Sequence, residues 1–156
     1  MLSNQWILII KWLILLLFLI VIAIKDIREY MIPNRILLLA CYIRVIIFII
    51  ELFTRKIDFN ILCTKCIAVG IILFSGIIIN IITHNGIGFG DVKLFLVVAI
   101  YVDIESIVDI IINSIFIMGI ITILLLIMRK KGRKDIVPFA PSILLAVIVR
   151  GICCYI

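Results

Sequence analysis

The stretch HNGIGFGDVK, residues 84–93, places an aspartate, Asp91, behind three alternating glycines: Gly86, Gly88 and Gly90. Glycines at every second position let a backbone come close to another chain, because no Cβ stands in the way. The sequence around this stretch is that of a membrane domain, where an ionisable residue is costly and usually functional. Asp91 is therefore the first candidate for a functional residue.

The composition indicates how the rest of the chain folds. The 156 residues are 67% hydrophobic and have a mean hydropathy of +1.46. A water-soluble domain needs far more polar surface, whereas lipid solvates such a sequence directly. Short polar breaks separate six apolar stretches, at 6–24, 36–53, 61–82, 94–102, 107–128 and 138–156. A spanning helix needs about 20 apolar residues. The sequence predicts an all-α, polytopic transmembrane helix bundle of about six spans, forming a single domain over residues 1–156.

The fourth apolar stretch is short for a span. It reaches a sufficient length only if Asp91–Lys93 forms its first turn and the helix continues past Tyr101.

The basic residues indicate the orientation of the bundle. The breaks after the first, third and fifth stretches hold nine Lys and Arg residues, and the other breaks hold only Arg55 and Lys56. Cytoplasmic loops carry the excess of basic residues, so the first set is predicted to be cytoplasmic and the N-terminus to lie outside. The net charge of +6 does not indicate nucleic-acid binding, because no basic face alternates with aromatic residues. The expected surroundings are the lipid bilayer.

A second acid, Asp26, follows the first apolar stretch, and Ile32-Pro33-Asn34 comes soon after it. Pro33 is pre-shaped for a helix start, and the Asn34 side chain can satisfy exposed backbone groups there. The predicted orientation puts Asp26 and Asp91 on the cytoplasmic side of different helices, so the two can face each other. The plainer alternatives are that Asp26 is a solvated loop charge and that Asp91 caps a helix.

Two neighbouring carboxyl groups support hydrolysis, because the charge of one makes ionisation of the other difficult, so that one stays protonated. One donates a proton to the scissile carbonyl while the other activates water, and the protons belong to the pair. No competing set is present, since His84 is the sole histidine. Cys63 and Cys66 have the spacing of half a zinc ribbon or of a redox pair, but the second half is missing. We expect the cysteines to be structural, and no metal site.

The chain resembles the prepilin peptidases, polytopic GxGD aspartic proteases that trim leader peptides from type IV pilins and related proteins. Three blocks carry the resemblance: Asp26 with Ile32-Pro33-Asn34, then residues 86–94, then Val137-Pro138-Phe139-Ala140-Pro141, which is similar to the family's Pro-Phe-Gly-Pro.

The resemblance implies roles for individual residues. It makes Asp26 and Asp91 the catalytic pair and Lys93 the basic residue after the motif. Gly86, Gly88, Gly90, Lys93, Pro33 and Asn34 are then candidates for shaping the loop or binding substrate. The implied partners are pilin-like precursors, cleaved just after a glycine. The implied location is the bacterial cytoplasmic membrane, with the site facing the cytoplasm.

Two departures from the family refine this expectation. Bifunctional members methylate the new N-terminus and carry a cytosolic loop with paired Cys-x-x-Cys motifs, which this sequence lacks. We therefore expect a short, peptidase-only form similar to those of Flp pili, with no methyltransferase domain, no S-adenosylmethionine site and no other cofactor. Ala140 stands where the family usually has glycine.

Two alternatives remain. One is a GxGD protease of the presenilin kind, although those are larger and hold their aspartates deeper in the membrane. The other is a non-catalytic small polytopic membrane protein, such as a transporter subunit or a degenerate paralogue.

Overall fold

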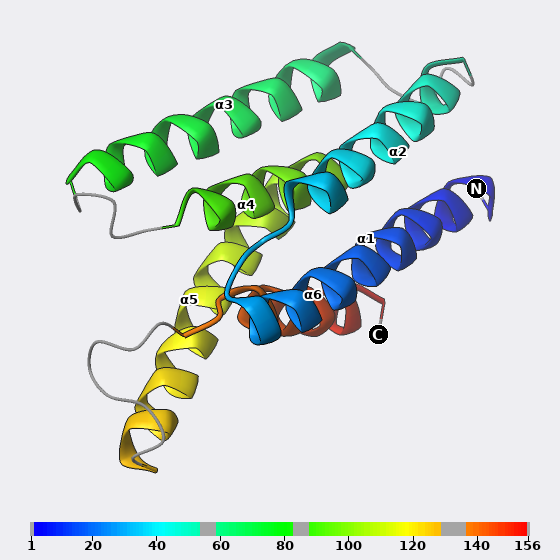
Figure 1. Ribbon diagram of the computed structural model, residues 1–156. Helices are drawn as coiled ribbons and strands as arrows, with labels where there is room; N and C mark the ends of the chain where they lie inside the picture. Colours follow the sequence, from blue (N-terminus) through cyan, green and yellow to red (C-terminus); the bar gives the residue numbers. More distant parts are fainter. Residues whose placement is uncertain (1, 54–58, 83–87, 129–136, 156) are drawn as a thin grey trace. The chain divides into compact units, whose positions relative to one another are not determined.

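The computed structural model describes residues 2–53, 59–82, 88–128 and 137–155, and within these ranges it contains six helices and no strand (Figure 1). The helices are α1 (Leu2–Glu29), α2 (Asn34–Phe53), α3 (Phe59–Ile82), α4 (Phe89–Tyr101), α5 (Ile104–Ile127) and α6 (Ala140–Tyr155). The prediction of an all-α, polytopic helical bundle is confirmed.

Two helix ends differ from the sequence prediction. α1 continues to Glu29, which places Asp26 inside the helix and not in the break after it. α4 has Asp91 in its first turn, as expected, but it ends at Tyr101 and does not continue. Val102 is extended, with φ −105° and ψ 170°, and the carbonyl of Asp103 already accepts the Ile107 N–H of the next helix at 2.9 Å. Aspartate is a favoured residue just before a helix, so α5 begins where α4 was expected to run on.

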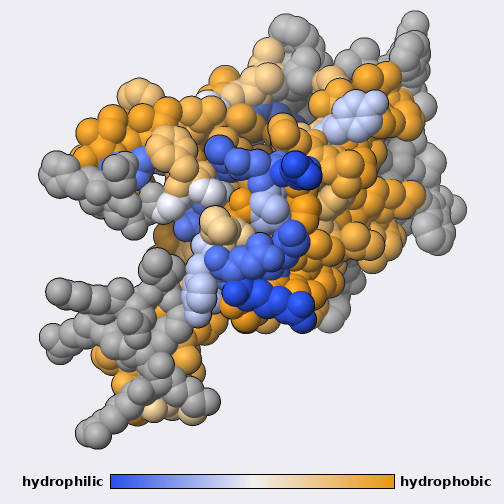
Figure 2. Space-filling view, viewed as in Figure 1, coloured by the Kyte–Doolittle hydropathy of each residue, from blue (hydrophilic) through white to orange (hydrophobic). Residues whose placement is uncertain are grey.

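The surface of the helices is that of a membrane protein. Within the described residues, three segments are long and apolar enough to cross a bilayer: Leu8–Glu29, Cys63–Ile82 and Glu105–Ile127. Many large hydrophobic side chains are exposed on the helices, and hydrophobic residues are prominent on the face that Figure 2 shows. α4 has 13 residues and α6 has 16, so the number of spans and the outside N-terminus stay predictions.

The chain divides into two compact units. Unit 1 comprises Met1–Ile32 and Val108–Ile156, and in it α1 packs along α6. The buried face of α1 follows a helical spacing through Leu15, Leu19 and Ile22 to Asp26. Gly151 of α6 lies against α1, since a Cβ added to it would be at ordinary contact distance, 3.6 Å, from the Trp12 ring.

Unit 2, Pro33–Ile107, is built around α4, which packs against both α2 and α3 (Figure 1). α2 runs parallel to α4, and the Tyr101 hydroxyl donates a hydrogen bond to the Ala40 carbonyl at 2.8 Å. α3 runs antiparallel to α4, and Gly76 gives it a close approach, because a Cβ there would lie 2.5 Å from Val92 Cγ1. The sequence prediction of one domain over the whole chain stays a prediction.

Candidate functional site

Asp26 lies in the last turn of α1, on the face that carries the buried leucines and Ile22, and only 5% of its surface is exposed. Its Oδ2 accepts a hydrogen bond of 2.9 Å from the backbone N–H of Ala140. A carboxylate at the C-terminal end of a helix faces the negative end of that helix's dipole. Ala140 is the first residue of α6, so the positive end of a second helix offsets this cost.

The block Val137–Pro141 explains why α6 starts at Ala140. The carbonyl of Phe139 accepts the N–H groups of Ser142 and Ile143, at 3.0 and 3.3 Å, so Phe139 is the N-cap. Pro141 has no N–H and loses nothing in a first turn, where such groups have no helical partner. The N–H of Ala140 is left over, and it is the one that binds Asp26. Sequence reasoning missed this link, although the proline block was the signal that could have shown it.

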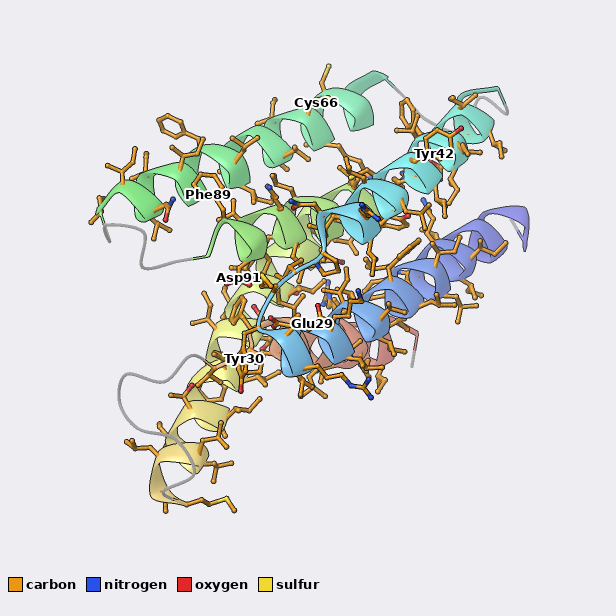
Figure 3. All side chains as sticks on the ribbon, viewed as in Figure 1. Glu29, Tyr30, Tyr42, Cys66, Phe89 and Asp91 are labelled. Atoms are coloured by element: carbon orange, nitrogen blue, oxygen red, sulfur yellow. The ribbon has the colours of Figure 1, made fainter. Side chains whose placement is uncertain are left out.

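Asp91 lies in the first turn of α4, where the helix dipole favours a carboxylate (Figure 3). The helix begins at the N-cap Gly88, whose carbonyl accepts the Asp91 N–H at 3.0 Å. The half-buried side chain folds back over the N-cap, since Oδ2 lies 3.4 Å from the position that a Cβ of Gly88 would occupy. Asp91 is therefore an acid of the first helical turn, three residues after the N-cap Gly88, and is not itself the cap that the plainer alternative expected.

Gly88 does not have an unusual backbone conformation. Its φ of −61° and ψ of 128° are open to any residue. What the missing side chain provides is space beside the Asp91 carboxylate. Gly90 is half-buried inside α4, and Gly86 lies outside the described residues.

Pro33 and Asn34, at the start of α2, meet the start of α4 within unit 2. The carbonyl of Pro33 accepts the N–H groups of Ile36 and Leu37 at 3.1 and 3.3 Å, so this proline starts α2, as predicted. The Asn34 side chain has a different hydrogen-bond partner from the one predicted. Its side-chain oxygen accepts a hydrogen bond of 3.2 Å from Lys93 Nζ, whereas the sequence predicted a backbone partner. The fold thus brings Asn34 and Lys93 together, 59 residues apart in sequence.

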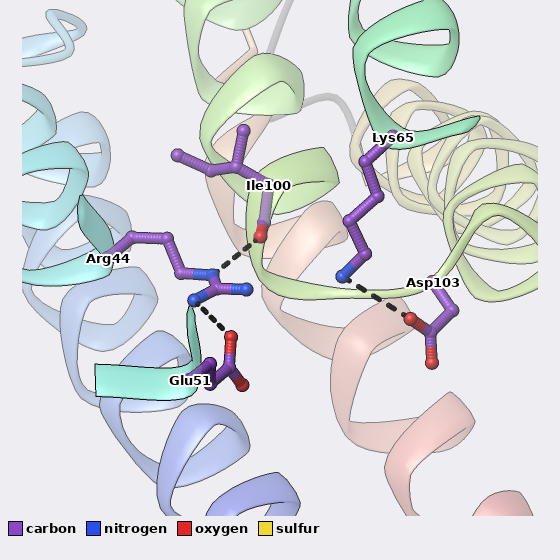
Figure 4. Close-up of polar contacts among 5 residues, drawn as sticks. All are labelled: Arg44, Glu51, Lys65, Ile100 and Asp103. Atoms are coloured by element: carbon purple, nitrogen blue, oxygen red, sulfur yellow. Dashed lines mark hydrogen bonds and ion pairs between the residues drawn. The ribbon is translucent and has the colours of Figure 1, made fainter. Parts of the chain in front are cut away.

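A buried ion pair lies at the opposite end of α4 from Asp91 (Figure 4). Arg44 donates from Nη1 to Glu51 Oε2 at 3.1 Å and from Nε to the carbonyl of Ile100 at 2.8 Å. The second bond satisfies a carbonyl at the C-terminal end of α4, where helical partners run out. Sequence reasoning missed this pair, for which the signal was two opposite charges seven residues apart in one apolar stretch.

Metal binding finds no support in the described part of the chain, where no group of three or more His, Cys, Asp or Glu side chains could hold an ion. Cys63 and Cys66 are exposed and have free thiols.

Comparison with models of known protein families gives a match. The sequence profile of the type IV leader peptidase family matches residues 13–123. The match covers more than half of the chain, including Asp26 and Asp91, and ends before the block at 137–141. No curated protein matches the chain significantly, and neither does any solved structure.

Proposed function

Because the chain belongs to the type IV leader peptidase family, we propose that it is an aspartic endopeptidase that removes the basic leader from pilin-like precursors. The family match carries this proposal, since it spans both acids that the sequence singles out. The hydrophobic surface supports the membrane as the place of action.

Asp26 and Asp91 are the proposed catalytic pair, acting on one water molecule. One carboxylate removes a proton from the water, which attacks the scissile carbonyl carbon, while the other carboxyl donates a proton to the carbonyl oxygen. The tetrahedral intermediate then collapses and the C–N bond breaks: the amine takes the proton that the first carboxylate removed from water, and a hydroxyl of the intermediate returns a proton to the second carboxylate. The Ala140 N–H bond supports this role, because it holds one oxygen of Asp26 in place while the other stays available.

The proposed substrate enters from the cytoplasmic face of the bacterial membrane. This orientation rests on the nine basic residues in the odd-numbered breaks. A precursor with a basic leader and an apolar helical stem would place its cleavage site at the same membrane edge. Hydrolysis there uses water that is already present, so none has to be brought to the bilayer centre.

The test is co-expression with a Flp-type or type IV prepilin, read as shortening of the precursor on a gel. Asp26→Asn and Asp91→Asn should each lower cleavage by about 10²–10⁴-fold, the usual contribution of a positioned acid or base. Asp103→Asn is the matched control, since this acid is exposed, pairs with Lys65 and lies beyond the far end of α4.

Two outcomes would contradict the proposal. Cleavage at the wild-type rate by either variant would remove that aspartate from the catalytic pair. If the wild type leaves several inserted precursors intact, the non-catalytic alternative, a degenerate paralogue, takes its place.

A further inference from the structure

Helix α3 is largely apolar and exposed, but it contains one buried polar side chain, Asn80. Over the described residues 63–82, Asn80 alone is buried, with 6% of its surface exposed, while the isoleucines on either side of it are exposed. Its Oδ1 finds no hydrogen-bond partner in the described part of the chain. A buried carbonyl oxygen without a donor costs stability, and more so within a membrane. A buried amide whose oxygen has no donor is costly in a membrane helix, and such residues usually have a function.

The register of α3 against α4 places Asn80 beside the start of α4. Gly76 packs against Val92, and Lys65, eleven residues earlier, forms a 3.4 Å ion pair with Asp103, eleven residues later. The two helices are therefore antiparallel with a constant register. Asn80 follows Gly76 by four residues and shares its face.

The same register puts Asn80 level with Gly88, which precedes Val92 by four residues. Gly88 is the N-cap of α4 and the residue over which Asp91 Oδ2 folds. The register thus places Asn80 on the α3 face that packs on α4, at the level of the N-cap that Asp91 Oδ2 approaches.

We infer that Asn80 binds the substrate backbone, with Oδ1 accepting a hydrogen bond from a peptide N–H near the scissile bond. The inference rests on the proposed function, because it deepens the same site. An extended peptide that crosses Gly88 exposes backbone N–H groups that it cannot pair internally, and these groups need acceptors at membrane depth. The buried Asn80 oxygen, which has no partner among the described residues, is such an acceptor. Binding thereby pairs the Asn80 side-chain oxygen with a substrate N–H, and each of these groups is costly when it is unpaired.

The first experiment replaces the amide by an isosteric apolar side chain. Asn80→Leu should lower kcat/KM for a synthetic pilin-like precursor peptide about tenfold, the usual value of one hydrogen bond. Thermal stability in detergent should stay equal or rise, because an unsatisfied buried group is removed. Asn113→Leu is the matched control, since this asparagine is exposed on α5. Asn80→Ala repeats the test if the leucine variant does not fold.

The second experiment identifies the bond itself. A set of peptides carries one ester in place of one amide at successive positions around the cleavage site, which removes a single N–H donor. If Asn80 accepts one of these donors, the ester at that position slows wild type about tenfold but hardly slows Asn80→Leu. A merely structural role for Asn80 predicts additive losses at every position.

The outcomes separate the inference from the proposed function. Cleavage by wild type with additive losses throughout, or an Asn80→Leu variant as active as wild type, overturns the inference and leaves the peptidase intact. A wild-type protein that cleaves no precursor overturns both.

Discussion

Asp26 and Asp91 both lie in terminal turns of helices, but at opposite ends. Asp91 is in the first turn of α4, where its own helix favours a carboxylate and the N-cap is three residues away. Asp26 is in the last turn of α1, where its own helix disfavours the charge and the hydrogen-bond donor comes from α6, 114 residues further on. One acid is thus positioned by local structure and the other by tertiary packing. Substitutions that disturb packing should affect the two acids differently.

The largest expected effect on stability belongs to the buried ion pair of unit 2. Arg44→Met removes the guanidinium that lies 3.1 Å from the buried Glu51 carboxylate and should lower the free energy of unfolding by about 3–5 kcal/mol. Because Asp91 is positioned locally, the protein that remains folded should still cleave near the wild-type rate. Thermal unfolding in detergent and cleavage at low temperature measure the two quantities.

Lys65→Met is the control for that experiment. Its partner Asp103 is mostly exposed, so the loss should stay below about 1 kcal/mol. Loss of activity in folded Arg44→Met would show that Asp91 also depends on distant packing.

The next effect tests the tertiary support of Asp26. Ala140→Pro removes one N–H at the first helical position, which tolerates proline. The lost bond to a charged group should cost about 1.5–3 kcal/mol of stability, and cleavage by the folded protein should fall at least tenfold. Ala140→Gly keeps the N–H and should remain active. Equal rates for the two variants would mean that the hydrogen bond does not position Asp26.

A third substitution tests how closely α3 must approach the start of α4. Gly76→Ala places a Cβ 2.5 Å from Val92 Cγ1, and a short, branched side chain in a packed interface has little room to move. We expect a loss of about 1–3 kcal/mol and recovery in the double variant Gly76→Ala with Val92→Ala.

Gly70→Ala is the matched control in the same helix, because nothing lies within 4 Å of its added Cβ. It should stabilise the helix by up to about 1 kcal/mol. If Gly76→Ala is equally harmless in thermal unfolding, the close contact is not needed.

The smallest effect concerns Lys93 and Asn34. Their hydrogen bond is exposed, so Lys93→Met and Asn34→Ala should each change the free energy of unfolding by less than about 0.5 kcal/mol. A double-mutant cycle measures the coupling between them. A coupling above about 1 kcal/mol would mean that this bond, and not only the helix start, positions the beginning of α4.

The same contrast explains what could be predicted from the sequence. Gly88, Asp91 and Lys93 lie within one helix start, so their neighbourhood could be inferred from a run of residues. The six helices could also be predicted, because apolar runs in lipid must satisfy their backbones internally.

What could not be predicted depends on contacts distant in sequence. The bond from Ala140 to Asp26, the Lys93–Asn34 contact and the burial of Asn80 each join separate helices. Hydropathy gives the order of the helices but not which face of each is buried, since apolar residues, above all isoleucine, occupy most positions of α3. Asn80 is one polar residue in a long apolar run, so the sequence alone does not single it out.

The bond between Ala140 and Asp26 also bears on how the protein is made. At about 5–20 residues per second, translation adds the Ala140 N–H roughly 6–23 s after Asp26 leaves the ribosome's catalytic centre. Asp91, by contrast, is synthesised only three residues after its N-cap Gly88, so the two residues can contact each other almost at once. A nascent chain with five helices inserted therefore holds Asp26 without its donor. Synthesis order alone would delay the maturation of this carboxylate until the sixth helix docks.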